Sequence, residues 1–272
     1  MELSAWFENL LFGRDRAAGT PPVVTIVGSG GKTSLIWHLA ANKAPSDHSG
    51  VVRRKILVTP TTKMLVPSDD KLYDRYYDGI TNCITDGITG DPIPGVTLAG
   101  CFNEATGKLE SLPLPALSEL ISSYDLVLLE GDGSRGLPLK AWAADEPVVP
   151  AFTTLTVGVL PLWPLGKPIS ESMIHRLPLF LSLTGATAGE TLKPEHITAV
   201  ITGAACGGGL LCGGGLFAKA RGKKALFFNQ AEDDEALKQA REVVGLLPPD
   251  FRAGLCAIIA GSVQLNNVLS LD

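Results

Sequence analysis

The sequence contains few aromatic residues and few residues of the kinds that commonly bind metals. Aromatic side chains make up 6% of its 272 residues, and it has 4 histidines and 5 cysteines. An odd number of scattered cysteines in a chain of this length gives no disulfide framework, so we expect reduced thiols in the cytoplasm. His175 lies beside Arg176 with no second histidine before His196, and Cys206 and Cys212 match no zinc spacing. The glycine-rich stretch 204–215 is therefore expected to be a loop near a site or a partner.

The sequence also lacks an excess of positive charge and a long uninterrupted apolar helix pattern. Its net charge is −5, which gives no support for a basic nucleic-acid-binding face. The uncharged run 147–166 is broken by prolines, which favours a buried strand with turns over a membrane span. The first 13 residues lack the basic region and cleavage site of a signal peptide, and their apolar residues have the spacing of a short helix. We expect a cytoplasmic protein that binds neither nucleic acid nor membrane.

The rest of the sequence alternates between apolar strand patterns and helix patterns. Hydrophobic residues make up 45% of the chain and charged residues 19%, as expected for a folded chain with a sizeable core. Buried strands are expected at 23–27, 55–59, 126–129, 153–160, 223–229 and 256–260, and helices at 115–123, 193–200 and 232–245. This alternation predicts an α/β fold with a doubly wound, mostly parallel sheet. We expect one domain over residues 1–272, with a β-hairpin at 95–112 and insertions near 68–112 and 161–220.

The first strand pattern leads into a glycine-rich turn and then a helix pattern. The sequence VVTIVGSGGKTS covers residues 23–34, and apolar side chains then recur with helical spacing. Glycines at this junction allow backbone N–H groups to surround an anion at the positive end of the helix. Lys32 would contact the β- and γ-phosphates, and the Thr33 hydroxyl would bind Mg²⁺. The expected nucleotide-binding residues are Gly28, Ser29, Gly30, Gly31, Lys32, Thr33 and Ser34. We also expect Lys32 to lie at a solvent-facing loop mouth.

This loop is shorter than the common phosphate-loop pattern. Ile26 stands where that pattern has its first glycine, which leaves the spacing G-x-x-G-K-T/S. In this respect the loop resembles the phosphate loop of Mur-type ligases. A purely structural turn is the alternative interpretation of the same residues.

Polar residues follow the second predicted strand. Pro60 follows the predicted strand 55–59, and Thr61, Thr62 and Lys63 come directly after it. Ligands of open parallel sheets bind beyond the carboxyl ends of the strands, so these residues are candidates for contact with phosphate or Mg²⁺. An ordinary capped turn is the alternative.

The third strand pattern ends in carboxylates. Glu130 follows the apolar run 126–129, and Asp132 follows within a glycine-rich turn. A carboxylate at such a strand tip commonly holds Mg²⁺ or orients an attacking water in phosphoryl-transfer enzymes. Arg135 and Lys140 come next, and either could stabilise charge on a transferred phosphoryl group or only pair with nearby acids. We expect Lys32, Glu130, Asp132 and Arg135 to be catalytic, and Thr33, Glu130 and Asp132 to bind Mg²⁺. Simple turn residues are the alternative interpretation of Glu130 and Asp132.

Together these segments resemble one known family. VGSGGKTS at 27–34, TPTTKM at 59–64, LEGDGSRGLPLK at 129–140, EPVVP at 146–150 and the pair His175-Arg176 are similar to the YqeC family of selenium-dependent molybdenum hydroxylase accessory proteins. The resemblance implies a P-loop NTPase-like fold and a nucleotide-binding protein that helps a molybdenum hydroxylase to mature. It also implies partners, namely the hydroxylase or its cofactor-maturation proteins.

One departure concerns the nucleotide base. Members of the family and GTPases often carry an Asn-Lys-x-Asp element where this sequence has Asn229-Gln230-Ala231-Glu232. Asn229 is expected to contact the nucleotide, but the substitutions leave both ATP and GTP as candidates. Lys140, His175 and Arg176 are candidates for the phosphate or substrate side, with a structural role as the alternative for the last two.

Three functions fit these expectations. The first is a Mg²⁺-dependent NTPase that changes its contacts with a client on hydrolysis, with catalysis by positioning and charge stabilisation. The second is an ATP-dependent ligase or transferase that acts on a small substrate. The third is a partner module that binds nucleotide without hydrolysing it.

Overall fold

The computed structural model describes residues 1–13, 20–41, 53–79, 91–203 and 214–271, and its main feature is one large sheet. Within these ranges the sheet has 11 strands, ten of them in the order β13-β12-β11-β9-β1-β7-β2-β5-β6-β3, with β4 paired to β5. The chain is therefore mixed α/β, as predicted. The strands are β1 (Val23–Gly28), β2 (Lys55–Pro60), β3 (Lys63–Leu65), β4 (Arg75–Asp78), β5 (Gly95–Asn103), β6 (Lys108–Glu110), β7 (Leu126–Glu130), β9 (Leu155–Pro161), β11 (Lys223–Asn229), β12 (Ala257–Ser262) and β13 (Asn267–Ser270).

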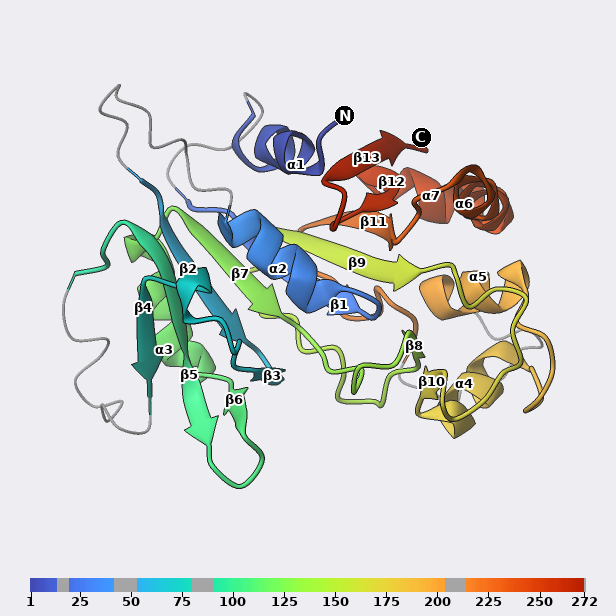
Figure 1. Cartoon of the computed structure of the whole chain (residues 1–272), viewed down its shortest axis with the longest axis horizontal. Helices are drawn as coiled ribbons and strands as arrows, with labels where there is room; N and C mark the ends of the chain where they lie inside the picture. Colours follow the sequence, from blue (N-terminus) through green and yellow to red (C-terminus); the bar gives the residue numbers. More distant parts are fainter. Residues whose placement is uncertain (14–19, 42–52, 80–90, 204–213, 272) are drawn as a thin grey trace.

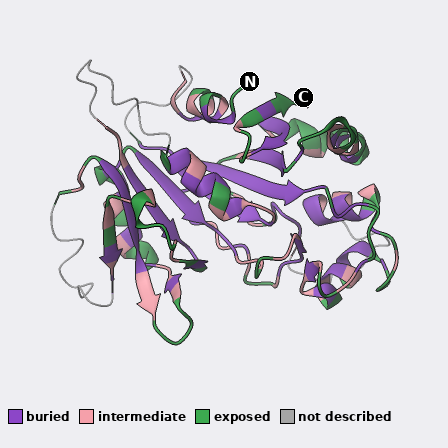
Figure 2. Cartoon of the chain, viewed as in Figure 1, coloured by how far each residue is buried: buried purple, intermediate pink, exposed green. Residues whose placement is uncertain are grey.

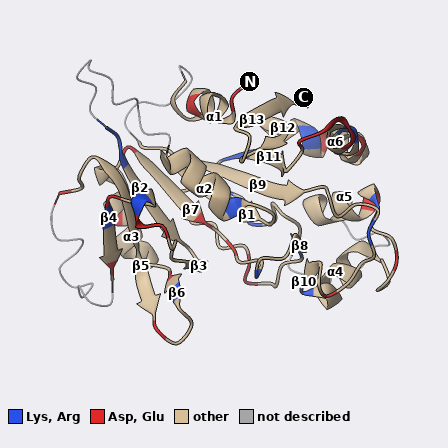
Figure 3. Cartoon of the chain, viewed as in Figure 1, with Lys and Arg blue, Asp and Glu red and all other residues tan. Residues whose placement is uncertain are grey.

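The centre of the sheet is parallel. β1 lies between β7 and β9, with Ile26 opposite Glu130 and Gly28 opposite Val159. The antiparallel pairs of the described sheet are at its margins, between β12 and β13, β5 and β6, and β3 and β6. Because the central strands run in one direction, their carboxyl ends meet at one edge of the sheet. Charged residues are sparse along these strands (Figure 3), and Glu130 is the last residue of β7.

Helices cover both faces of this sheet. They are α1 (Leu3–Phe12), α2 (Lys32–Ala41), α3 (Leu114–Leu120), α4 (Leu177–Thr184), α5 (Pro194–Thr202), α6 (Asp234–Leu246) and α7 (Pro249–Ala253), with short 3₁₀ turns at Asp70–Leu72 and Ile121–Ser123. Alternate residues of each strand point to opposite faces. Val24 and Ile26 therefore pack in the core that includes α1 and α2, whereas Val27 packs in the core that includes α4, α5 and α6. All six residues of β1 are buried, and the purple central strands of Figure 2 show this burial.

The predicted hairpin at 95–112 is only partly correct. Residues 101–103 of β5 pair with β6 in antiparallel fashion, but the first half of β5 pairs with β2 in parallel and belongs to the main sheet. The apolar side chains Val96, Leu98 and Ala99 explain the difference, because they are buried in the sheet's cores. β5 is therefore a strand of the main sheet with a hairpin at its end.

Several elements had no strong sequence pattern and were not predicted. They include the edge strand β13, helix α4, and a small separate sheet in which β8 (Leu139–Lys140) pairs in parallel with β10 (Ile174–His175). Most of the glycine-rich stretch 204–215, which was expected to be a loop, lies outside the described residues. No helix within the described ranges combines the length and apolar content needed to span a bilayer.

Candidate phosphate and magnesium site

The glycine-rich loop connects the carboxyl end of β1 to the first turn of α2. Gly28, Gly30 and Gly31 all have positive φ values, of 105°, 71° and 124°. A Cβ atom would lie 2.2 Å from the Val159 carbonyl oxygen at Gly28, and 2.2 Å from Asn229 Nδ2 at Gly31. Glycine is therefore required by backbone conformation and by the close approach of β9 and β11.

Two N–H groups of the loop have no partner in the described part of the chain. Gly28 N donates to Asp132 and Ser29 N donates to the Val159 carbonyl, but Gly30 N and Gly31 N donate to no described oxygen. Both glycines are partly exposed. The Ser29 hydroxyl is buried and also lacks a described partner. Free donors at the start of a helix are suited to an anion. Ser34 is exposed in the first turn of α2.

Lys32 is buried rather than solvent-facing, which contradicts our expectation. Its side chain is 4% exposed, and its Nζ donates to the Gly28 carbonyl at 2.7 Å and lies 3.3 Å from Asp132 Oδ1. The side chain turns back over the loop because a buried ammonium needs an acceptor or a counter-charge, and both are supplied there. Lys32 was predicted to contact a bound phosphate, but here its ammonium group contacts Gly28, the first residue of the loop.

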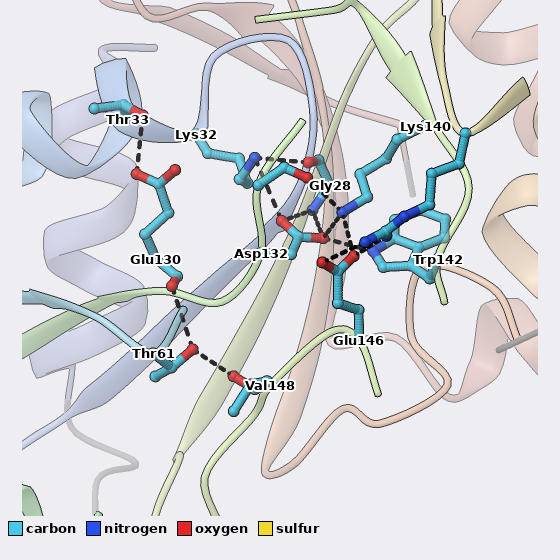
Figure 4. A network of polar contacts seen from close by, with 12 residues as sticks. Gly28, Lys32, Thr33, Thr61, Glu130, Asp132, Lys140, Trp142, Glu146 and Val148 are labelled. Carbon is cyan, nitrogen blue, oxygen red and sulfur yellow. Dashed lines mark hydrogen bonds and ion pairs between the residues drawn. The ribbon is translucent and has the colours of Figure 1, made fainter. Parts of the chain in front are cut away.

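Asp132 is fully buried and joins the loop to its surroundings. Both carboxylate oxygens lie 3.1 Å from Gly28 N, and Oδ2 accepts a 2.5 Å hydrogen bond from Trp142 Nε1. Lys32 and Lys140 lie 3.3 and 3.2 Å from the carboxylate. Figure 4 shows these contacts converging on Asp132. The carboxylate is therefore saturated by protein donors, and its geometry is that of a group that positions the loop.

Glu130 and Thr33 face each other across the strand end. The Thr33 hydroxyl donates to Glu130 Oε2 at 2.9 Å, which joins the first turn of α2 to the tip of β7 (Figure 4). Burial raises the pKa of Glu130, while the charge of Lys32 and the Thr33 hydrogen bond oppose that rise. Two of the three side chains expected to bind Mg²⁺, those of Thr33 and Glu130, are thus in direct contact.

Thr61, Thr62 and Lys63, the three residues after β2, have different surroundings. The Thr61 hydroxyl donates to the backbone carbonyls of Val148 and Glu130, at 2.7 and 3.2 Å, and the Thr62 hydroxyl is buried without a described partner. Lys63 is 52% exposed and pairs with Glu110 at 2.8 Å. Because β3 pairs with β6, Lys63 belongs to the hairpin, and the structure does not bring it into this site.

Asn229 contacts the loop from the end of β11. Its Nδ2 donates to the Gly30 carbonyl at 2.9 Å, and its Oδ1 accepts from Val263 N at 3.0 Å. Glu232 Oε1 accepts a 2.7 Å hydrogen bond from the Ser262 hydroxyl. The segment expected to lie near the nucleotide base is therefore attached to the loop through one carboxamide.

Ion pairs extend from Asp132 toward β10 and α4. Lys140 is fully buried, and its Nζ lies 2.9 Å from Glu146 Oε2 and 2.6 Å from the Gly133 carbonyl oxygen. Arg176 NH2 donates to Glu146 Oε1 at 2.9 Å, and NH1 donates to Glu146 Oε2. Burial raises the pKa of Glu146, but Arg176 and Lys140 outweigh it and lower the pKa to about 2.

His175 and Arg135 complete this region. Arg135 is exposed, whereas His175 is partly buried in β10. Burial and the charges of Arg176, Lys140 and Arg135 lower the pKa of His175 to about 4. Its imidazole is therefore neutral near pH 7, in a region of positive potential.

Two residues of this network were not predicted, Trp142 and Glu146. Trp142 follows Lys140 by two positions, and Glu146 begins the EPVVP segment. Neither has a pattern of its own, because each acts through contacts between distant parts of the chain. The EPVVP segment was the one available signal for Glu146.

The donor set is compatible with magnesium. Thr33 and Glu130 both present oxygen atoms, which Mg²⁺ prefers, and Mg²⁺ commonly uses one or two protein groups with phosphate and water. Within the described ranges, no three His, Cys, Asp or Glu residues are grouped as a metal site would require. An all-protein metal cage is therefore not what the described residues offer.

Comparisons with known proteins agree with the motifs. The family model described as "YqeC protein" matches residues 24–178, a range that includes the loop, Glu130, Asp132, His175 and Arg176 but ends before Asn229. The chain is 30% identical over 186 residues to "Uncharacterized protein YqeC" of Escherichia coli (strain K12). The aligned segment covers 66% of this chain and 68% of that protein. No solved structure gives a significant match.

Proposed function

The chain belongs to the YqeC family, and we propose that it binds ATP or GTP with Mg²⁺ and hydrolyses it slowly. One observation carries this proposal, namely the 2.9 Å contact between Thr33 Oγ1 and Glu130 Oε2, with Lys32 in the same loop. A phosphate-loop hydroxyl beside a carboxylate on the adjacent strand is the arrangement that P-loop enzymes use to hold Mg²⁺. We also propose that the sheet is P-loop NTPase-like, with β1 as the strand that leads into the loop.

The loop would bind the phosphates through its free donors. Gly30 N, Gly31 N and the Ser29 hydroxyl lack described partners, so none of their hydrogen bonds has to be broken to accept a phosphate oxygen. Lys32 would exchange the Gly28 carbonyl for a phosphate oxygen. Asp132 keeps Gly28 in position during this exchange, because it also has Trp142 and Lys140 as partners.

Thr33 and Glu130 would hold Mg²⁺. The ion, when bound, neutralises charge on the phosphates. Glu130 would also orient a water molecule for attack, since its second carboxylate oxygen has no described hydrogen-bond donor. Catalysis of this kind consists of positioning and charge stabilisation, so turnover without a partner is expected to be slow.

The base would lie beyond β11 and β12. Asn229 links this region to Gly30, and Glu232 is held by Ser262. A carboxylate there is an acceptor for the paired N–H groups of guanine, whereas adenine presents an acceptor nitrogen beside its amino group. The carboxylate of Glu232, which Ser262 holds beyond the end of β11, therefore favours GTP, with ATP as the second candidate.

The client proposal rests on the motif resemblance. Segments 27–34, 59–64 and 129–140 are similar to accessory proteins of selenium-dependent molybdenum hydroxylases. We propose such a hydroxylase, or a protein that matures its cofactor, as the partner whose contacts change on hydrolysis.

A second candidate function is an ATP-dependent ligase or transferase. The observation that favours it is the set of cations Lys140, Arg176 and Arg135 beside the loop, where a second anionic substrate could bind. Release of ADP or AMP that depends on a small substrate would identify this function. Nucleotide binding without phosphate release, even in the presence of a client, would instead identify a non-catalytic partner module.

Calorimetric titration with GTP, ATP and their diphosphates, with and without Mg²⁺, tests the main proposal. We expect Mg²⁺-dependent binding that Lys32→Ala abolishes. Lys63→Ala is the matched control, since Lys63 lies near the site in sequence but pairs with Glu110 on the hairpin. Absence of binding by the unmodified protein, or normal affinity in Lys32→Ala, would contradict the proposal.

A further inference from the structure

A group of cations lies beside the phosphate loop, around the small sheet of β8 and β10. His175 on β10 is opposite Lys140 on β8, and Arg176 follows at the start of α4. Figure 1 shows this sheet close to the carboxyl end of β1. Lys140 connects the two regions, because its Nζ lies 3.2 Å from the carboxylate of Asp132, which in turn accepts from Gly28 N. The cation group is therefore adjacent to the loop.

Arg176 of this group, and Arg135, whose charge helps to lower the pKa of His175, both have an uncommon backbone conformation. The φ value is 54° at Arg135 and 62° at Arg176, both in the left-handed region. Residues other than glycine rarely adopt this conformation, and such outliers concentrate at functional sites. A solvated turn would be less strained with glycine or asparagine at these positions. The conformation is thus an indication that both arginines have a functional role as well as a place in the loop.

The group has donors that the fold leaves available. Glu146 engages only the two terminal nitrogens of Arg176, so the guanidinium retains N–H groups for another acceptor. Arg135 is exposed and pairs with no carboxylate among the described residues. His175 has a pKa lowered to about 4 and is a neutral donor near pH 7. Asp145, which is exposed, adds a negative charge near Arg176 but does not pair with Arg135.

We propose that Arg135, His175 and Arg176 form a second anion subsite that takes the phosphate group of a non-nucleotide phosphate monoester. That this subsite is second, next to a bound nucleotide, rests on the proposed function. Guanidinium groups recognise phosphate by paired hydrogen bonds. Two guanidinium groups and one imidazole suit the several terminal oxygens of a phosphate better than the two oxygens of a carboxylate. Glu146 and Lys140 are positioning residues that fix Arg176 and the sheet.

The experiment is a titration of the full chain with inorganic phosphate and with glycerol 3-phosphate. It compares the unmodified protein with Arg135→Asn, His175→Gln, Lys32→Ala and the control Arg252→Ala. Asparagine tolerates the left-handed conformation, so Arg135→Asn is expected to fold. Arg252 is an exposed arginine on α7, so its variant makes the same change of charge elsewhere.

We expect glycerol 3-phosphate to bind with an affinity that falls at least about tenfold in Arg135→Asn and in His175→Gln. Arg252→Ala should change it less than about twofold, and binding that depends on Lys32 but not on Arg135 would belong to the phosphate loop. Absence of binding, tighter binding of inorganic phosphate than of the monoester, or loss in Lys32→Ala without an effect of Arg135→Asn would overturn the proposal. Should Lys32→Ala fail to fold, the response of Arg135→Asn alone decides.

Failure of the proposed function has a different result. If the unmodified protein binds no nucleotide but binds glycerol 3-phosphate in an Arg135-dependent manner, the subsite stands and the nucleotide assignment falls. If the unmodified protein binds nucleotide but not glycerol 3-phosphate, the nucleotide assignment stands and the subsite proposal falls.

Discussion

Asp132 accepts hydrogen bonds from Gly28 N through both carboxylate oxygens, at 3.1 Å each, and so connects the first glycine of the loop to the segment after β7. The same carboxylate contacts Lys32, Lys140 and Trp142. The phosphate loop and the buried ammonium groups of Lys32 and Lys140 are therefore joined through one carboxylate, as Figure 4 shows. A change at Asp132 is expected to affect all of them.

Asp132→Asn should destabilise the fold strongly. The substitution removes the counter-charge that Lys32 and Lys140 share, and both ammonium groups are buried. Breaking a buried ion pair typically costs about 3–5 kcal/mol. Urea unfolding should show a loss of this size, while Asp250→Asn on the exposed start of α7 should change the free energy of unfolding by less than ~0.5 kcal/mol. Equal losses in the two variants would contradict the assigned role.

Thr33→Val should remove the dependence of nucleotide binding on Mg²⁺. Valine has nearly the shape of threonine but cannot donate to Glu130 or contribute an oxygen ligand. We expect the affinity for the Mg²⁺-nucleotide to fall at least about tenfold, or ~1.4 kcal/mol. Thr33→Ser keeps the hydroxyl and should retain the dependence. Calorimetry with and without Mg²⁺ measures both, and an unchanged Mg²⁺ effect in Thr33→Val would remove Thr33 from the ion site.

Gly31→Ala tests the close approach of β11 to the loop. A Cβ at Gly31 would lie 2.2 Å from Asn229 Nδ2 and would push Asn229 away from the Gly30 carbonyl. Gly107→Ala is the control, because φ is also positive there but nothing lies within 4 Å of the added Cβ. The control should lose only about 1 kcal/mol from backbone strain. We expect thermal unfolding to show a larger loss for Gly31→Ala, and equal losses would mean that the Asn229 contact is unimportant.

Stability should depend on pH through His175. Its folded pKa is about 4, below the unfolded value of ~6.5, so the unfolded chain binds the extra proton first as the pH falls. The contribution of His175 to stability is fully present above about pH 6.5 and is lost progressively as the pH falls to about 4. Urea unfolding across this window should show a shallower decline for His175→Gln than for the unmodified protein. Parallel curves for the two proteins would show that folding does not lower the pKa of His175.

Glu146 should act at lower pH. Its folded pKa is about 2, and an unfolded glutamate titrates near ~4.3, so its contribution is present above ~4.3 and is lost as the pH falls toward 2. Glu146→Gln should therefore reduce stability near neutral pH and flatten the acid limb below ~4.3. An acid limb as steep as that of the unmodified protein would assign the acid sensitivity to other carboxylates.

The sequence by itself determined the parts of this protein that depend on local patterns. Apolar runs predicted β1, β2, β7, β11 and β12 within one or two residues, because strands buried on both faces require continuous apolar side chains. The loop was recognisable because its glycines occur between a strand pattern and a helix pattern, and Glu130 because it ends an apolar strand. The position of Thr33 and Glu130 at one sheet edge followed from parallel pairing.

Only the tertiary structure decided how the charged side chains are used. The two-residue strands β8 and β10 are too short to have a pattern, yet they place His175 opposite Lys140. The pairing of β3 with β6 takes Lys63 away from the site. Lys32 is buried because Gly28 and Asp132 supply its acceptors. Local sequence sets backbone preference and burial, but the partner of a buried charge comes from distant segments that pack beside it, and only the complete fold specifies these.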